Sequence, residues 1–241
     1  MEVKTLLLYD YPESFLKKKW ILLKIFIKEG LFGKKWSVFF QNRTVGGSLV
    51  IPQSLVQGLR ENKFALAINN YTTQNNNVVV VLKNCAALNW AIEQKKQGRI
   101  QKLIAGPFIA TFPHENRKIL SSSEIDGLLF LSDWHRNLFL LHFKGPAPRD
   151  YLWFSGVDTQ YWQPTNQPKN KILIYHKAEA PGVFPKIIPL LRQRGLESQI
   201  LQYGKYTQRD FNGHLNESRL AIFISQSETQ GVSLLEAWSM N

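Results

Sequence analysis

Short apolar runs recur along most of the chain, and segments with helical periodicity separate them. The clearest run, residues 78–82, is β-branched and uncharged, as expected of a strand buried on both faces of a parallel sheet. Further apolar runs, most of them predicted strands, lie at 3–9, 36–41, 64–68, 100–105, 125–131 and, shorter, at 151–154. Predicted helices at 51–61, 85–98 and 133–141 alternate with them, and Ser132 is a plausible N-cap of the last. This alternation predicts a parallel α/β fold.

The same alternation starts again in the last third of the chain. Predicted strands lie at 171–175, 198–202 and 219–225, predicted helices at 183–194 and 231–241, and a polar segment at 206–217 has no assigned element. Prolines and polar residues mark the break before this second series. We therefore predict an N-terminal domain at 1–157, a linker at 158–170 and a C-terminal domain at 171–241. The last helix has no cap, so we expect the second domain to be incomplete.

Residues 1–35 are either a basic N-terminal extension or the first βα unit. Within them, residues 13–29 form an amphipathic helical pattern, with Lys17, Lys24 and Lys28 on one arc and apolar side chains opposite. A helix packed on the core with a solvated lysine face is the favoured interpretation. The alternative is an anchor at an anionic membrane surface, with Trp20 entering the interface.

Composition narrows the classes of partner. A net charge of +12 favours an anionic partner: nucleic acid, an acidic membrane surface or a phosphorylated small molecule. The absence of a basic motif interleaved with aromatics argues against nucleic acid. The single cysteine, Cys85, and the lack of an apolar span or signal peptide predict a cytoplasmic protein, soluble or peripheral at a membrane face. No His, Cys and Asp pattern has the spacing of metal ligands, so no metal is expected.

The most specific block of chemistry lies at residues 220–240, an apolar strand followed by a polar turn, a glycine and a helix. Open α/β sheets bind ligands at such turns, and the first amides of the helix, near Gly231, Val232 and Ser233, suit a phosphate. Gly231 would let the ligand approach closely. Glu228 and Glu236 can accept hydrogen bonds from sugar and ribose hydroxyls. Taken singly, each glutamate could instead be a solvated carboxylate that the helix dipole favours.

This block, Ser-Glu-x-x-Gly-x-x-x-x-Glu-Ala after an apolar strand, resembles the Glu-x7-Glu donor-binding motif of the retaining GT-B glycosyltransferases. Residues 154–164 are similar to the segment that precedes the second domain in this family. Gly46 and Gly47 resemble the Gly-Gly loop of its first domain, and residues 125–134 resemble the last strand of that domain. The resemblance covers the chain from about residue 36 onward.

The resemblance implies a GT-B fold, in which two Rossmann-like domains face a cleft that Gly46 and Gly47 would line. It also implies metal-independent transfer of a sugar, with retention, from a nucleotide-diphosphate sugar to a glycan or lipid-linked acceptor. Glu236 would hold the ribose and Glu228 the sugar. The family commonly places an arginine and then a lysine beside the diphosphate; here Lys177 would take the arginine's role, and Lys186 is the nearest later lysine.

Many members of the family also use a histidine of the first domain near the reacting sugar. Gly106 and Pro107 stand where that motif is expected, and His114 and His135 follow as candidates, with a surface or capping role as the alternative for each. Because the second domain is expected to be incomplete, a rival hypothesis is a non-catalytic GT-B fragment or binding module.

Overall fold

The computed structural model of the chain describes residues 5–9, 47–72, 76–164, 171–177, 182–226 and 228–240. The predicted helix at 13–29, the predicted strand at 36–41 and Gly46 lie outside these residues. The described part of the chain forms two compact units that divide between Gly156 and Val157. Unit 1 contains the first strand and residues 51–156, and unit 2 contains residues 47–50 and the described residues from 157 to 240.

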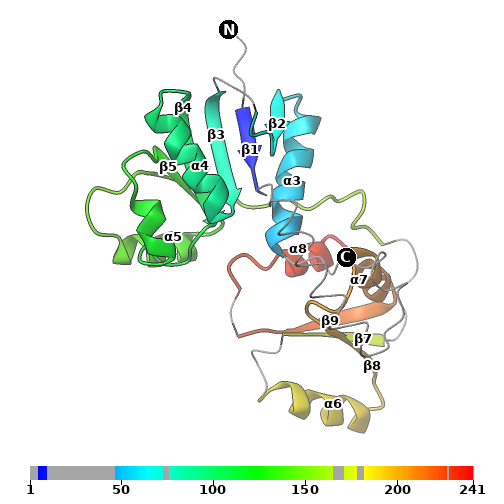
Figure 1. Cartoon of the computed structure of the whole chain (residues 1–241). Coiled ribbons are helices and arrows are strands. Elements are labelled where there is room, and N and C mark those ends of the chain that lie inside the picture. The colour runs from blue at the N-terminus through cyan, green and yellow to red at the C-terminus, as the bar shows by residue number, and fades with distance from the viewer. Residues whose placement is uncertain are drawn as a thin grey trace, which may run out of the picture. The chain divides into compact units, whose positions relative to one another are not determined.

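Unit 1 is built on a six-stranded parallel sheet with the strand order β2-β1-β3-β4-β5-β6 (Figure 1). Its strands are β1 (Thr5–Leu8), β2 (Leu66–Ile68), β3 (Asn76–Lys83), β4 (Ile100–Phe108), β5 (Gly127–Phe130) and β6 (Arg149–Leu152). The helices between them are α3 (Gly47–Glu61), α4 (Cys85–Lys96), the short 3₁₀ helix η1 (Asn116–Ser121) and α5 (Asp133–His142). The parallel α/β fold expected from the alternating pattern is therefore confirmed for this half of the chain.

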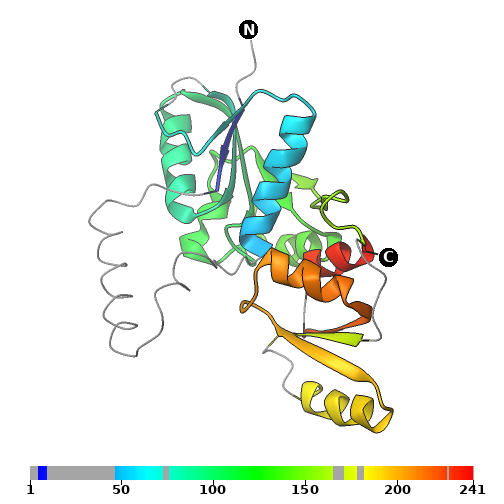
Figure 2. The ribbon, with the colours of Figure 1, turned by 90° about the vertical axis from the view of Figure 1, so that its right-hand side faces the viewer.

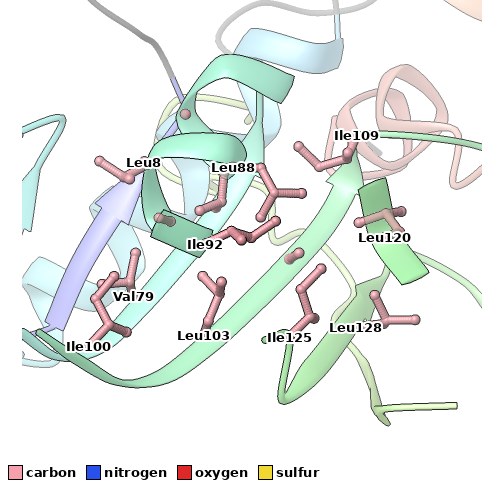
Figure 3. Close-up of a cluster of buried hydrophobic side chains, with 14 of the residues drawn as sticks. Leu8, Val79, Leu88, Ile92, Ile100, Leu103, Ile109, Leu120, Ile125 and Leu128 are labelled. Atoms are coloured by element: carbon pink, nitrogen blue, oxygen red, sulfur yellow. The ribbon is translucent and has the colours of Figure 1, made fainter. Parts of the chain in front are cut away.

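The core of unit 1 lies on both faces of the sheet. On one face α4 and α5 cover the strands with an almost wholly aliphatic cluster in which Leu88, Ile92 and Leu103 meet (Figure 3). On the other face α3 contributes Val56 against Leu7 and Leu82. One of the two central strands is β3, whose uncharged run was predicted to be buried on both sides. Burial of this kind is the main source of stability for the unit, at roughly 25 cal/mol per Å² of apolar surface.

Unit 2 has a smaller parallel sheet of three strands, β8-β7-β9. They are β7 (Lys171–His176), β8 (Glu197–Gln202) and β9 (Ser218–Ile224), joined by α6 (Phe184–Gln193) and α7 (Gln208–Asn216) and followed by α8 (Val232–Trp238). In Figure 2, α6 lies on one face of this sheet, and α7 and α8 lie on the other. No helix in the described ranges is long and apolar enough to cross a bilayer.

The two faces of the smaller sheet differ in chemistry. Aliphatic side chains of α6, such as Leu191, pack against Ile172 and Ile174. The opposite face is aromatic, with Tyr175 and Phe211 at its centre. Trp162, which lies in the predicted linker at 158–170, is only 3% exposed and belongs to this aromatic core.

Two local expectations are wrong. Gly47, expected in a Gly-Gly loop, is the first residue of α3. The helix continues through Pro52, which removes a single amide donor at some cost. The polar segment at 206–217 contains α7. Its N-cap is Thr207, whose side chain and that of Asp210 form a reciprocal capping box.

Candidate functional site

The predicted site residues of unit 2 gather at the carboxyl end of its parallel sheet. His176 at the end of β7 pairs in register with Ile224 at the end of β9. Lys177 follows β7 directly, and its amide donates a hydrogen bond to the Ile224 carbonyl at 2.9 Å. Glu228 lies in the turn after β9. The carboxyl ends of parallel strands are where α/β sheets bind ligands.

Lys177 and Glu228 are in direct contact. The Lys177 Nζ atom lies 2.5 Å from Glu228 Oε1, and the two side chains are 15% and 29% exposed. The same ammonium lies over the ring of Tyr203, 5.0 Å from its centroid, a distance at which a cation and an aromatic face attract each other. Two residues that the sequence placed in one site, 51 positions apart by their numbers, are thus brought together.

Gly231 makes the turn that leads into α8. Its φ of 71° is in the left-handed region, which glycine adopts without strain. A Cβ atom at this position would also lie 2.9 Å from Leu234 Cδ1. The sequence suggested that Gly231 leaves room for a ligand; the structure gives a reason for the glycine within the fold itself. Val232 is the first residue of α8 and is half-buried.

Ser233 connects α8 to the aromatic core. Its side chain makes a hydrogen bond with Tyr175, whose hydroxyl also lies 2.9 Å from the hydroxyl of Tyr206. Burial raises the pKa of Tyr175 to about 12 and also raises the pKa of Tyr206, so both phenols are neutral at physiological pH. Ala237 of α8 also packs against this aromatic core.

Glu236 is buried, with only 6% of the residue exposed. Desolvation raises the pKa of its carboxyl to about 8, and a hydrogen bond with the Gln208 side chain offsets that rise in part. Because an unpaired buried carboxylate is costly, the neutral acid is favoured at pH 7. A protonated carboxyl can donate one hydrogen bond and accept others, whereas a carboxylate only accepts.

In unit 1, His114 lies in the loop between β4 and η1. Its ring stacks on Phe112 with centroids 5.5 Å apart, and Phe112 also contacts His142 at 5.6 Å. His142 is the last residue of α5, a helix that runs back from the carboxyl end of β5 toward the start of β6. The loop that holds His114 follows the carboxyl end of β4, and its residues Ala110 and Thr111 lie beside His135 in the first turn of α5.

His135 is the buried histidine of unit 1. It is in the first turn of α5, where the Ser132 hydroxyl accepts its amide at 3.3 Å, and its ring meets Phe130 edge-on at 5.3 Å. Neither ring nitrogen makes a hydrogen bond of ordinary geometry with the residues that the structure describes. Burial lowers its pKa, and the backbone of Thr111 and Ala110 opposes this only in part.

Several neighbours of the site were not singled out from the sequence. Tyr203, Gln208 and Tyr206 all follow β8, whose carboxyl end lies beside that of β7. The signal that could have found them is their position directly after a predicted strand. Lys186, the alternative phosphate lysine, is exposed in the first turn of α6.

The geometry equips one edge of unit 2 to hold an anion and polyhydroxylated groups. Lys177 supplies a positive charge, Glu228 supplies acceptors for hydroxyl groups, and Tyr203 supplies an aromatic face that is 42% exposed. Among the described residues, no group of three or more His, Cys, Asp and Glu side chains is placed to hold a metal ion. No protein-family model matches the chain, and no curated protein is similar enough in sequence to count as a relative.

Proposed function

We propose that the chain is a GT-B glycosyltransferase that binds a nucleotide-diphosphate sugar at the carboxyl end of the unit 2 sheet and transfers the sugar with retention. The observation that carries the proposal is the contact between Lys177 and Glu228 beside the turn that holds Gly231. These residues belong to two separate segments, and each was expected to meet a different part of the same donor.

Each residue has a distinct part in this proposal. Lys177 neutralises the diphosphate and stabilises its charge as the bond to the sugar breaks. Glu228 accepts hydrogen bonds from sugar hydroxyls. Glu236 meets the ribose as a neutral acid, a form that its raised pKa supports. The acceptor is proposed to be a glycan or a lipid-linked molecule, and the positive net charge would attract a phosphorylated acceptor or an anionic membrane surface.

Calorimetry with Lys177→Met tests the proposal, because methionine keeps much of the side-chain volume and removes the charge. Wild-type protein is titrated with sugar nucleotides that carry uridine, guanosine or adenosine diphosphate. We expect at least one to bind, and we expect the Lys177→Met variant to bind it about 10- to 100-fold more weakly, the effect of losing one hydrogen bond between charged groups.

Arg194→Met is the matched control for charge, since Arg194 lies exposed after α6, at the amino end of the same sheet. It should leave the affinity unchanged. If no sugar nucleotide binds the wild-type protein, or if Lys177→Met binds as tightly as Arg194→Met, the assignment is wrong. Binding without release of nucleoside diphosphate in the presence of acceptors would instead favour the alternative, a binding module.

A further inference from the structure

Lys177, the cation assigned to the donor diphosphate, already has an anionic partner within the fold. Glu228 Oε1 lies 2.5 Å from Lys177 Nζ, and Tyr203 covers the ammonium from another side. An ammonium group has three donors and no acceptor. A phosphate oxygen that binds Lys177 must therefore share the ammonium with the Glu228 carboxylate or displace it.

Backbone hydrogen bonds hold Lys177 and Tyr203 in place. The Lys177 amide is bonded to the Ile224 carbonyl on one neighbouring strand, and the Tyr203 amide is bonded to the His176 carbonyl on the other, each at 2.9 Å. The base of the Lys177 side chain is thus fixed between β8 and β9. What can change on binding is the orientation of the side chains, above all that of Glu228.

Two kinds of ligand meet this ion pair differently. A bare diphosphate brings negative charge next to the Glu228 carboxylate and offers it no hydroxyl donor, so repulsion opposes binding. A diphosphate that carries a sugar brings hydroxyl groups that can donate to the released carboxylate and replace the contact with Lys177. The Glu228 carboxylate therefore weakens binding of the bare diphosphate and supports binding of the diphosphate that carries a sugar.

We propose that Glu228 is a specificity-determining residue that occupies Lys177 in the free protein and thereby selects nucleotide sugars over free diphosphates. The inference rests on the proposed function, because it takes the ligand to be a sugar nucleotide. It adds a means by which the site rejects the free nucleoside diphosphate, the product that glycosyl transfer would leave behind.

Glu228→Gln tests the inference, since glutamine keeps the shape and removes the charge. The probes are inorganic pyrophosphate, UDP with UDP-glucose, and GDP with GDP-mannose, titrated by calorimetry. We expect the variant to bind pyrophosphate and the nucleoside diphosphates about tenfold more tightly, a change of about 1.4 kcal/mol. We expect it to bind the preferred sugar nucleotide no more tightly than the wild-type protein does, so that the preference for the sugar falls by at least about tenfold.

Glu217→Gln is a closely matched control. Glu217 Oε2 pairs with Lys171 Nζ at 3.1 Å at the start of β7, so this variant also removes a carboxylate from a lysine of the same sheet, at its opposite end, where Glu197 remains 4.0 Å from that lysine. Thermal melting of both variants establishes that they are folded. A similar gain for pyrophosphate in Glu217→Gln would show a general effect of charge and would overturn the inference.

The remaining outcomes separate the inference from the proposed function. If the wild-type protein binds a sugar nucleotide and Glu228→Gln changes the affinity for diphosphate and sugar nucleotide by the same factor, selection by Glu228 is wrong while the function stands. If neither protein binds any probe, both are wrong. If Glu228→Gln gains affinity for pyrophosphate but no sugar nucleotide binds either protein, Glu228 does occupy Lys177 in the free protein. The selection for a sugar is then wrong, and so is the proposed function.

Discussion

The two units each bury one ionisable side chain on a helix that follows a strand, but the two groups have opposite charge when ionised. In unit 1 this group is His135, which is 5% exposed and lies on α5 after β5. In unit 2 it is Glu236, which is 6% exposed and lies on α8 after β9. Burial opposes the charged form of each group, so it lowers the pKa of the histidine and raises that of the glutamate.

This difference gives the units opposite responses to pH. A native state with a raised carboxyl pKa holds its proton more tightly than the unfolded chain does. Unit 2 therefore loses stability as the pH rises from the ordinary carboxyl pKa to the raised native value. A native state with a lowered histidine pKa resists protonation, so unit 1 loses stability as the pH falls. Unit 1 should therefore be the more sensitive to acid, and unit 2 the more sensitive to rising pH.

The largest expected effect is that of Glu236→Gln on unit 2. The carboxyl pKa moves from 4.5 to about 8, so stability present below pH 4.5 is lost as the pH rises toward 8. At about 1.4 kcal/mol per pKa unit, the loss is on the order of 5 kcal/mol. Glutamine does not titrate, so the variant should lose this dependence. Urea unfolding followed by hydrogen exchange of peptides from β7 and β9 measures it for unit 2 alone.

Glu197→Gln provides the comparison for that substitution, because Glu197 is an exposed carboxylate at the start of β8. It should keep the wild-type dependence on pH. An unchanged pH dependence in Glu236→Gln would mean that Glu236 is ionised and solvated in the native protein, and the contrast between the two buried groups would then fail.

A smaller effect of the opposite sign is expected for His135→Phe in unit 1. Phenylalanine keeps a ring against Phe130 and removes the titrating nitrogens. Stability present above the ordinary pKa of 6.5 is lost in the wild-type protein as the pH falls through the lowered native value. The variant should resist acid better than the wild-type protein, as measured by hydrogen exchange of peptides from β3 and β5.

His114→Phe is the natural reference for this test, because His114 is exposed and stacks on Phe112. It should retain the wild-type sensitivity to acid. If His114→Phe rather than His135→Phe protected unit 1 in acid, His114 would be the source of the sensitivity to acid. His135 would then not be the counterpart of Glu236 in unit 1.

The strands were predictable because their signal is local. An uncharged β-branched run such as 78–82 is compatible with few environments, and β3 and β7 lie where the apolar pattern placed them. Helix α7 was missed because most of its residues are polar and Gly213 interrupts them. Its two buried positions, Phe211 and Leu215, are four apart, and the capping residues Thr207 and Asp210 were the sequence signal that could have identified it.

The site was only partly predictable, because its contacts depend on the order of strands. Consecutive strands are neighbours more often than not, which favours β9 beside β8. In the structure β7 lies between them, and this order places Lys177 next to Glu228. The pKa of the buried Glu236 depends in part on Gln208, the first residue of the helix that the sequence did not predict. Neither contact has a local signal.

The smallest expected effect concerns the N-caps of two helices, α7 in unit 2 and α5 in unit 1. In unit 2, Thr207 Oγ1 accepts the Asp210 amide at 3.1 Å, and Asp210 Oδ2 accepts the Thr207 amide at 2.9 Å. In unit 1, Ser132 makes only one such bond, at 3.3 Å. We expect Thr207→Ala to lower the free energy of unfolding of unit 2 by about 1–2 kcal/mol, and Ser132→Ala to lower that of unit 1 by about 0.5–1 kcal/mol.

Thr207→Ser keeps the hydroxyl and should recover most of the loss, which separates the cap from simple packing of the threonine methyl group. Because α7 begins directly after this cap, Thr207→Ala should also loosen the contact between Gln208 and Glu236, and its cost should grow when the carboxyl ionises above pH 8. Equal costs at pH 6 and pH 9 would show that the capping box and the buried carboxyl act independently, since a shared contact requires their energies to depend on each other.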